Sequence, residues 1–123
     1  PDTIASDPER KALFDEAIAA AVSAYEKLLD AGVPAEDARY LLPNAAESKI
    51  VITMNVRELL HFFKLRCCNR AQWEIRDMAH RMLELARPTA PFVFADAGAP
   101  CVSGACPEGK MSCGNPYPRV KRS

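Results

Sequence analysis

Hydrophobic periodicity predicts helices along most of the first 88 residues. Apolar residues recur at helical spacing over residues 8–30, which predicts one long amphipathic helix. Ser6 and Glu9 have the spacing of an N-terminal capping box, and Gly32 suits the C-terminal cap. A short second helix is expected over residues 34–42, because a proline follows and the residue before proline avoids the α region. The side chains expected on the buried side of the long helix are Leu13, Phe14, Ala17, Ile18, Tyr25, Leu28 and Leu29.

The pattern changes at residues 49–54. Four apolar or β-branched residues follow one another at positions 50–53 without helical periodicity. Such a run is typical of a buried strand. We therefore expect a strand over residues 49–54.

Two further helices are expected between residues 55 and 88. Asn55 and Glu58 have capping spacing, and the helix that they begin is apolar on more than one side. A helix of that kind is buried or lies in an interface. Asn69 and Gln72 repeat the capping spacing before a fourth helix, which Pro88 should end.

From residue 88 onward the periodicity is lost. Six of the ten prolines, four of the five glycines and three of the five cysteines lie there. This composition predicts an irregular tail. We therefore expect one main folded region over residues 1–88 and a Cys/Pro/Gly tail over residues 89–123, in a chain whose 123 residues suit a single domain.

Composition argues against several classes of protein. The chain is 49% hydrophobic with a formal net charge of zero, which argues against a nucleic-acid partner, since such proteins carry a basic surplus. No run is long and apolar enough to cross a membrane. All five cysteines lie after residue 66, and their odd number does not suit a secreted disulfide framework. We expect a cytoplasmic protein.

The third helix carries the clearest candidate chemistry. Arg57 and His61 are four residues apart and so share a face, and Asn55 precedes them at a helix N-terminus that favours anions. Arg66 should point the opposite way if the helix is straight that far. Spacing alone leaves three interpretations open: two different anionic ligands, two copies of one site at a subunit interface, or snorkelling arginines beside a satisfied core histidine. Arg39 is either an ion-pair partner or a phosphate ligand.

Four blocks of sequence make a resemblance that decides between these interpretations. They are, in order, ARYLLP at residues 38–43, NVRELLHF at 55–62, LR at 65–66 and AQWEIR at 71–76. Together they resemble the C-terminal half of flavin-dependent thymidylate synthase (the thymidylate synthase complementing protein family). The resemblance covers roughly residues 8–88.

The resemblance implies an α+β fold that is mainly helical with one or two strands. It implies reductive methylation of dUMP to dTMP, with methylenetetrahydrofolate as the carbon donor, reduced FAD as the hydride carrier and NADPH as a co-substrate. Arg66 would bind the uracil and promote its ionisation at N3, and Arg39 would bind the nucleotide as well. FAD would contact Asn55, Val56, Arg57 and His61. The full-length enzyme would be a homotetramer with active sites between subunits.

The chain also departs from the family. The family's Arg-His-Arg triplet with a following serine is missing; the nearest string is His80-Arg81. The chain begins at Pro1, and its first methionine is Met54. We therefore expect a C-terminal fragment that is inactive alone. Its strand would have an unpaired edge, so we expect it to self-associate.

The tail leaves one question of chemistry open. No metal site is expected, but Cys101, Cys106 and Cys113 are weak candidates for zinc or iron–sulfur ligation, with Cys67, Cys68 or His80 as a fourth ligand. Otherwise these cysteines are free thiols or form one disulfide. The basic chain end is expected to be solvated and consists of Lys110, Arg119, Lys121 and Arg122. The alternatives to the enzyme are a non-catalytic helical interaction module and a thiol-rich metal-binding protein.

Overall fold

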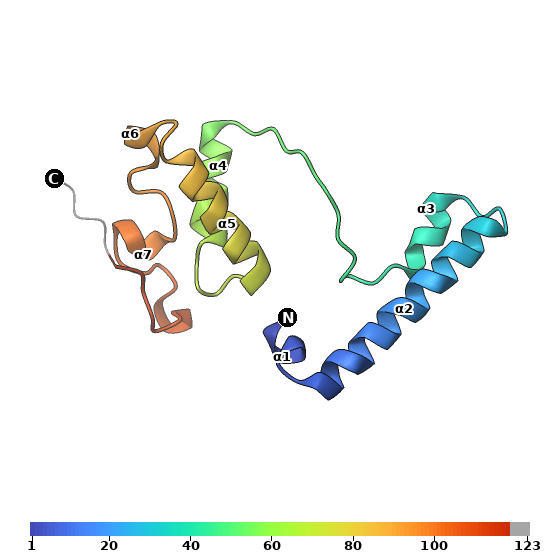
Figure 1. The fold of residues 1–123 in the computed structure, drawn as a ribbon. Coiled ribbons are helices and arrows are strands. Elements are labelled where there is room, and N and C mark those ends of the chain that lie inside the picture. The colour runs from blue at the N-terminus through green and yellow to red at the C-terminus, as the bar shows by residue number, and fades with distance from the viewer. Residues whose placement is uncertain (119–123) are drawn as a thin grey trace. The chain divides into compact units, whose positions relative to one another are not determined.

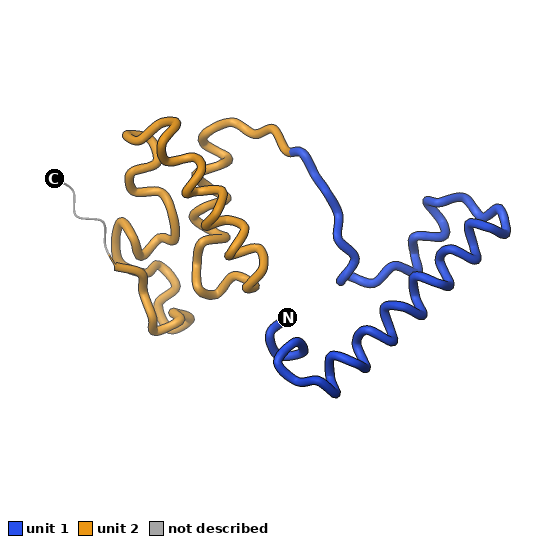
Figure 2. The backbone as a smooth tube through the Cα atoms, viewed as in Figure 1, with its two compact units in different colours: residues 1–51 blue, residues 52–123 orange. Residues whose placement is uncertain are grey.

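The chain divides into two compact units, which are described separately. The structure is a computed structural model and describes residues 1–118. Unit 1 spans Pro1–Val51 and unit 2 spans Ile52–Ser123 (Figure 2). Among the described residues, no helix combines the length and the apolar character needed to cross a membrane.

Unit 1 is built around one long helix. Its elements are the helices α1 (Asp2–Ala5), α2 (Pro8–Asp30) and α3 (Ala35–Ala38), and the 3-10 turn η1 (Arg39–Leu41), as Figure 1 shows. The helices predicted over residues 8–30 and 34–42 are therefore confirmed.

The N-terminal cap of α2 is Asp7, so the predicted cap at Ser6 is wrong. The Asp7 carboxylate accepts hydrogen bonds from the backbone N–H groups of Glu9 at 3.0 Å and Arg10 at 3.2 Å. An N-cap residue needs an extended backbone. Asp7 has one, whereas Ser6 is in the right-handed helical conformation at the end of α1.

The predicted C-terminal cap of α2 is confirmed. Gly32 has a φ of 82°, in the left-handed region that favours glycine. Its N–H donates to the carbonyl of Leu29 at 2.9 Å, and the N–H of Val33 donates to the carbonyl of Leu28 at 3.0 Å. These two bonds form a Schellman-type ending.

The apolar side of α2 is covered only over part of its length. Figure 1 shows α3 beside α2, and both α3 and η1 contact it. Phe14, Ile18, Tyr25 and Leu28 are half-buried there, but Leu13 is 70% exposed. In the described part of unit 1, only Ala38 is fully buried. The expected burial of this helix face is thus met only in part.

The strand predicted over residues 49–54 is wrong for this chain. These residues form neither strand nor helix, and no β-strand occurs within residues 1–118. The side chains of Ile50, Val51 and Ile52 are 76%, 98% and 56% exposed. A β-rich sequence forms a strand only where a neighbouring strand takes its backbone hydrogen bonds, and the described chain supplies no such neighbour.

Unit 2 is a pair of helices against which the described residues of the tail pack. Helices α4 (Val56–Arg66) and α5 (Trp73–Ala86) lie side by side (Figure 1). The tail contributes the short elements α6 (Pro91–Phe94), α7 (Pro100–Ser103) and η2 (Gly109–Met111). Both helix predictions are confirmed, and α5 ends before Pro88 as expected.

The N-terminal cap of α4 was predicted correctly, and that of α5 was not. The Asn55 side chain accepts a hydrogen bond from the N–H of Glu58 at 2.9 Å, as expected. The cap of α5 is Gln72, whose side chain accepts from the N–H groups of Glu74 and Ile75. The cap predicted at Asn69 is wrong, because its amide donates to the carbonyl of Asn115 at 2.7 Å.

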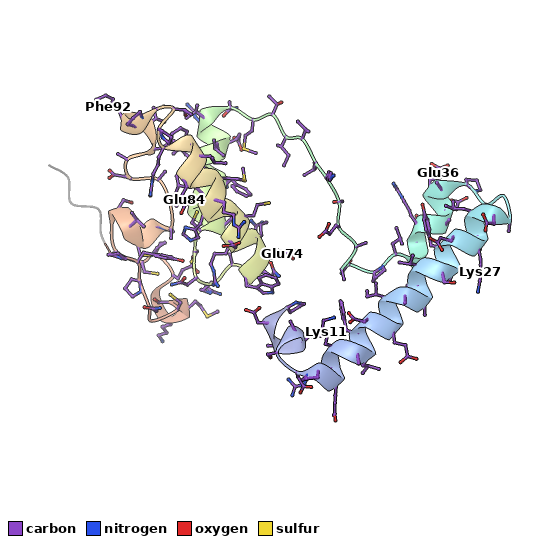
Figure 3. The ribbon with its side chains drawn as sticks, viewed as in Figure 1. Lys11, Lys27, Glu36, Glu74, Glu84 and Phe92 are labelled. Atoms are coloured by element: carbon purple, nitrogen blue, oxygen red, sulfur yellow. The ribbon has the colours of Figure 1, made fainter. Side chains whose placement is uncertain are left out.

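The core of unit 2 includes residues from the tail. Its buried members are Phe63, Cys67, Ala79, Leu83, Phe94, Ala97 and Ala99. The rings of Phe63 and Phe94 meet edge to face, with centroids 6.2 Å apart. Phe92, two residues before Phe94, is fully exposed (Figure 3). Residue 88 therefore lies inside one compact unit, and the expected boundary there stays a prediction about the family domain.

Candidate functional site

The first two turns of α4 gather the residues predicted to hold the flavin. Asn55 uses its side-chain oxygen in the cap, which leaves its amide N–H groups for a ligand. The N–H groups of Val56 and Arg57 lie in the first turn, where a helix offers no internal acceptor. Arg57 and His61 are exposed and four residues apart, so they occupy one side. These groups are all donors or cations, as an anionic ligand requires.

Arg66 is the last residue of the same helix. The helix runs without interruption from Val56, so Arg66 lies about 16 Å along the axis from Asn55. Its exposed side chain lines a cavity of about 270 Å³ between the end of α4 and the tail. Because α4 is a regular helix over this length, Arg57 and Arg66 are still expected to point to opposite sides of it.

Arg39 belongs to unit 1. It is exposed at the start of η1 and lines a shallow pocket of about 330 Å³ with Glu36, Asp37 and Tyr40. The two arginines predicted to bind the nucleotide thus come from different units. Each unit alone presents only one of them.

The described arginines fall into two groups. Those with a partner inside the chain bond to a carboxylate or a carbonyl and are Arg10, Arg70, Arg76, Arg81 and Arg87. Within residues 1–118, the arginines with no such hydrogen bond or ion pair are Arg39, Arg57 and Arg66. They are the same three that sequence analysis selected as ligand-binding residues. Their charge is therefore available to a ligand.

Cys67 is unsuited to act as a nucleophile. It is fully buried in the core of unit 2. Burial raises the pKa of its thiol from 9.0 to about 11, and the nearby positive charge of Arg87 offsets only part of that rise. The reactive form of cysteine is the thiolate, which is scarce at neutral pH when the pKa is this high.

The remaining four cysteines line the cavity beside Arg66. They are Cys68, Cys101, Cys106 and Cys113. Within residues 1–118, no three His, Cys, Asp or Glu side chains are already placed to hold a metal ion. His80 contacts the hydroxyl of Tyr117 at 3.1 Å. Lys110 is exposed as expected, while Arg119, Lys121 and Arg122 lie outside the described residues.

The ion pair in the wall of this cavity was not expected from the sequence. Arg70 and Glu108 approach to 2.6 Å and both line the cavity. They are 38 residues apart, so no local spacing indicated the contact. The nearest signal was the basic character of residues 64–70 at the end of the helix.

Comparison with known proteins identifies the family. The family described as "Thymidylate synthase complementing protein" matches residues 1–92. A protein of Geobacter sulfurreducens named flavin-dependent thymidylate synthase is 56% identical over 93% of this chain and 49% of its own length. Proteins of the same name from Clostridium tetani and Nitratidesulfovibrio vulgaris are 43% and 50% identical, over 93% and 96% of this chain and 52% of their own lengths. The chain spans about half the length of these curated relatives, and it belongs to the thymidylate synthase complementing protein family.

Proposed function

We propose that this chain is part of a flavin-dependent thymidylate synthase and supplies residues for both of its ligands. The enzyme would convert dUMP to dTMP, with methylenetetrahydrofolate as the carbon donor and NADPH as the reductant. The observation that carries the proposal is the set of arginines without a partner inside the chain: Arg39, Arg57 and Arg66. An exposed arginine without a carboxylate partner favours anionic groups such as phosphates and an ionised pyrimidine.

Arg66 is the residue that activates the uracil ring. A guanidinium stays charged at any physiological pH, so it cannot take the N3 proton itself, and that proton passes to solvent water. A cation held beside the ring lowers the free energy of the N3 anion relative to the neutral ring. The anionic ring is more electron-rich and so better able to form the new bond to carbon. In this assignment Arg66 binds the base and Arg39 binds elsewhere on the nucleotide.

The first two turns of α4 fit FAD. Its pyrophosphate is an anion, and the helix offers free N–H groups at Val56 and Arg57 with the cationic side chain of Arg57 nearby. The Asn55 amide and the His61 ring add hydrogen-bonding groups on exposed positions. When bound and reduced by NADPH, FAD would supply the hydride for the reduction. These residues of the chain hold and orient it.

The chain would form these sites together with other polypeptide. It spans about half the length of its relatives, and its two nucleotide arginines come from separate units. We propose a homotetrameric enzyme of the cytoplasm in which sites lie between subunits. Residues 1–88 would form part of the family domain, and residues 89–123 would be its irregular extension. The chain alone is expected to be inactive.

The test joins this chain to the half of the Geobacter sulfurreducens relative that it does not match. The chimera is assayed for dTMP by chromatography, with dUMP, methylenetetrahydrofolate, FAD and NADPH supplied. Arg66→Ala should lower kcat/KM at least about 100-fold, since loss of one charge-stabilising donor typically costs about 10²–10³ in rate. Arg81→Ala is the matched control, because Arg81 is exposed and pairs with Asp77 on α5.

A chimera in which both variants keep full activity would contradict the role given to Arg66. The flavin assignment is tested separately, by the absorbance spectrum of the folded chimera after removal of free FAD. Arg57→Ala and His61→Ala should weaken FAD binding, and Arg81→Ala should leave it unchanged. A helical interaction module without enzymatic function would bind no flavin at all.

A further inference from the structure

Four of the five cysteines line one cavity although they are far apart in the sequence. Cys68 follows α4, Cys101 lies in α7, and Cys106 and Cys113 flank η2. The cavity of about 270 Å³ belongs entirely to unit 2. Structural zinc sites have four ligands, which are cysteine thiolates alone or thiolates together with histidine. Nothing in the proposed thymidylate synthase reaction uses these thiols.

The structure indicates which residue is suited to be the fourth ligand. From the sequence, Cys67, Cys68 and His80 were each candidates for a fourth ligand. Cys67 does not line the cavity and is buried in the apolar core, with its pKa raised to about 11. His80 does not line it either and contacts the Tyr117 hydroxyl. Cys68 is half-buried and lines the cavity with the tail cysteines.

The tail segment that carries these cysteines lacks a core of its own. None of residues 104–116 is fully buried. The segment is attached to the rest of unit 2 by the Arg70–Glu108 ion pair and the hydrogen bond from Asn69 to Asn115. Exposed ion pairs of this kind contribute at most about 1 kcal/mol. Small irregular segments without a core are commonly held by a metal or by disulfides, and no disulfide forms among residues 1–118.

The charges around the cavity suit a thiolate site. A divalent cation with four thiolates carries a net negative charge, which neighbouring cations must offset. Lys64, Arg66 and Arg70 all line the cavity, and Glu108 is the one carboxylate among its described lining residues. Nearby cations also favour the thiolate form of cysteine.

We propose that Cys68, Cys101, Cys106 and Cys113 bind one zinc ion in tetrahedral geometry. Each thiol releases its proton to solvent on binding, four in all, and no oxidant or reductant is consumed. The sulfurs do not yet stand in ligating positions, so the segment around η2 must close on the cavity. Gly109, which begins η2, and Gly114, which follows Cys113, both have a positive φ that allows the sharp turns of such a segment. The four thiols take no part in the proposed function, although Arg66 lines the same cavity.

The first test uses the full chain and the metals themselves. After chelation and reduction, Zn²⁺ should bind at one equivalent per chain. Co²⁺ in its place should give the thiolate-to-cobalt charge-transfer absorption of a tetrahedral site. Cys106→Ser and Cys113→Ser should each lower zinc affinity at least about 10-fold and reduce the cobalt absorption. Cys67→Ala is the matched control and should bind both metals as the unchanged chain does.

A second measurement covers variants that fail to fold. In the unchanged chain, zinc should protect the exposed Lys110 from trypsin, and a chelator should restore cleavage there. Binding of less than half an equivalent of zinc would overturn the proposal. So would cobalt absorption that depends on Cys67 but not on Cys106, or trypsin cleavage at Lys110 that ignores zinc. Thiols that stay unreactive after chelation would indicate a disulfide and would overturn it too.

Discussion

Replacing Phe94 by alanine tests whether the tail belongs to the core of unit 2. Phe94 is 3% exposed and packs edge to face on Phe63 of α4. Phe92, in the same short helix α6, is 100% exposed (Figure 3). The two substitutions remove the same atoms from the same element, so the difference between them isolates the burial of one ring.

The expected loss is large for a unit of this size. Truncation of a buried phenylalanine to alanine costs about 3–5 kcal/mol, which includes the lost transfer energy and the cavity that remains. A unit of about 70 residues has a free energy of unfolding of about 4–10 kcal/mol. Phe94→Ala should therefore remove a third or more of that stability. Phe92→Ala should change it by less than about 0.5 kcal/mol.

The assay is urea denaturation of the full chain followed by tryptophan fluorescence. The chain has a single tryptophan, Trp73, which begins α5 and so reports on unit 2. Phe94→Ala should shift the midpoint to much lower urea, and Phe92→Ala should leave it in place. Equal midpoints for the two variants would refute the reasoning, because they would mean that the tail does not pack on α4 and α5.

Three further predictions concern single residues. Asn55→Ala should destabilise unit 2 by about 1 kcal/mol in the same urea assay through loss of the α4 cap, and Asn55→Asp should not. Gly32→Ala should cost about 1–2 kcal/mol, measured by thermal melting of helical circular dichroism, because its φ is positive; Gly104→Ala, with extended backbone, should cost far less. The raised pKa of Cys67 favours the protonated thiol in the folded state, so its contribution to stability is constant below pH 9 and declines toward pH 11. Urea midpoints from pH 8 to 11 should fall less steeply in Cys67→Ala, and an unchanged slope would contradict the burial argument.

The helices could be predicted because their signals are local. The apolar repeat of residues 8–30, the Asn55 cap and the stop at Pro88 each act within a few residues, and each is found in the structure. Where two cap candidates were close together, the wrong one was chosen. Asp7 rather than Ser6 caps α2, because Ser6 has a helical backbone at the end of α1. Gln72 rather than Asn69 caps α5, because the Asn69 amide bonds to a carbonyl 46 residues away.

The strand could not be predicted correctly from residues 49–54 alone. Their β-branched side chains indicate a preference, but a strand also needs a neighbour to accept its hydrogen bonds. The same limit applied to the tail. Its loss of periodicity was recognised, but the burial of Phe94, Ala97 and Ala99 depends on contacts with α4 and α5 that no local pattern indicates.

The candidate site was predicted by residue type and spacing, and the structure adds the environment. Arg39, Arg57 and Arg66 were selected from their blocks of sequence, and they are the described arginines without a partner in the chain. Their roles toward dUMP and FAD stay predictions. The cavity beside Arg66 was not foreseen, since its lining comes from residues 64–71 and 100–116, which are distant in the sequence.

The exposed apolar segment before α4 affects how readily this polypeptide aggregates. Residues 50–55 contain no charge, no proline and no glycine, and the side chains of Ile50, Val51 and Ile52 are each more than half exposed. Six residues of this composition match the signature of cross-β fibre formation. Wherever the segment is left uncovered, it can stack on copies of itself, and amyloid growth should rise with concentration. A lysine at Val51 would act as a gatekeeper against it.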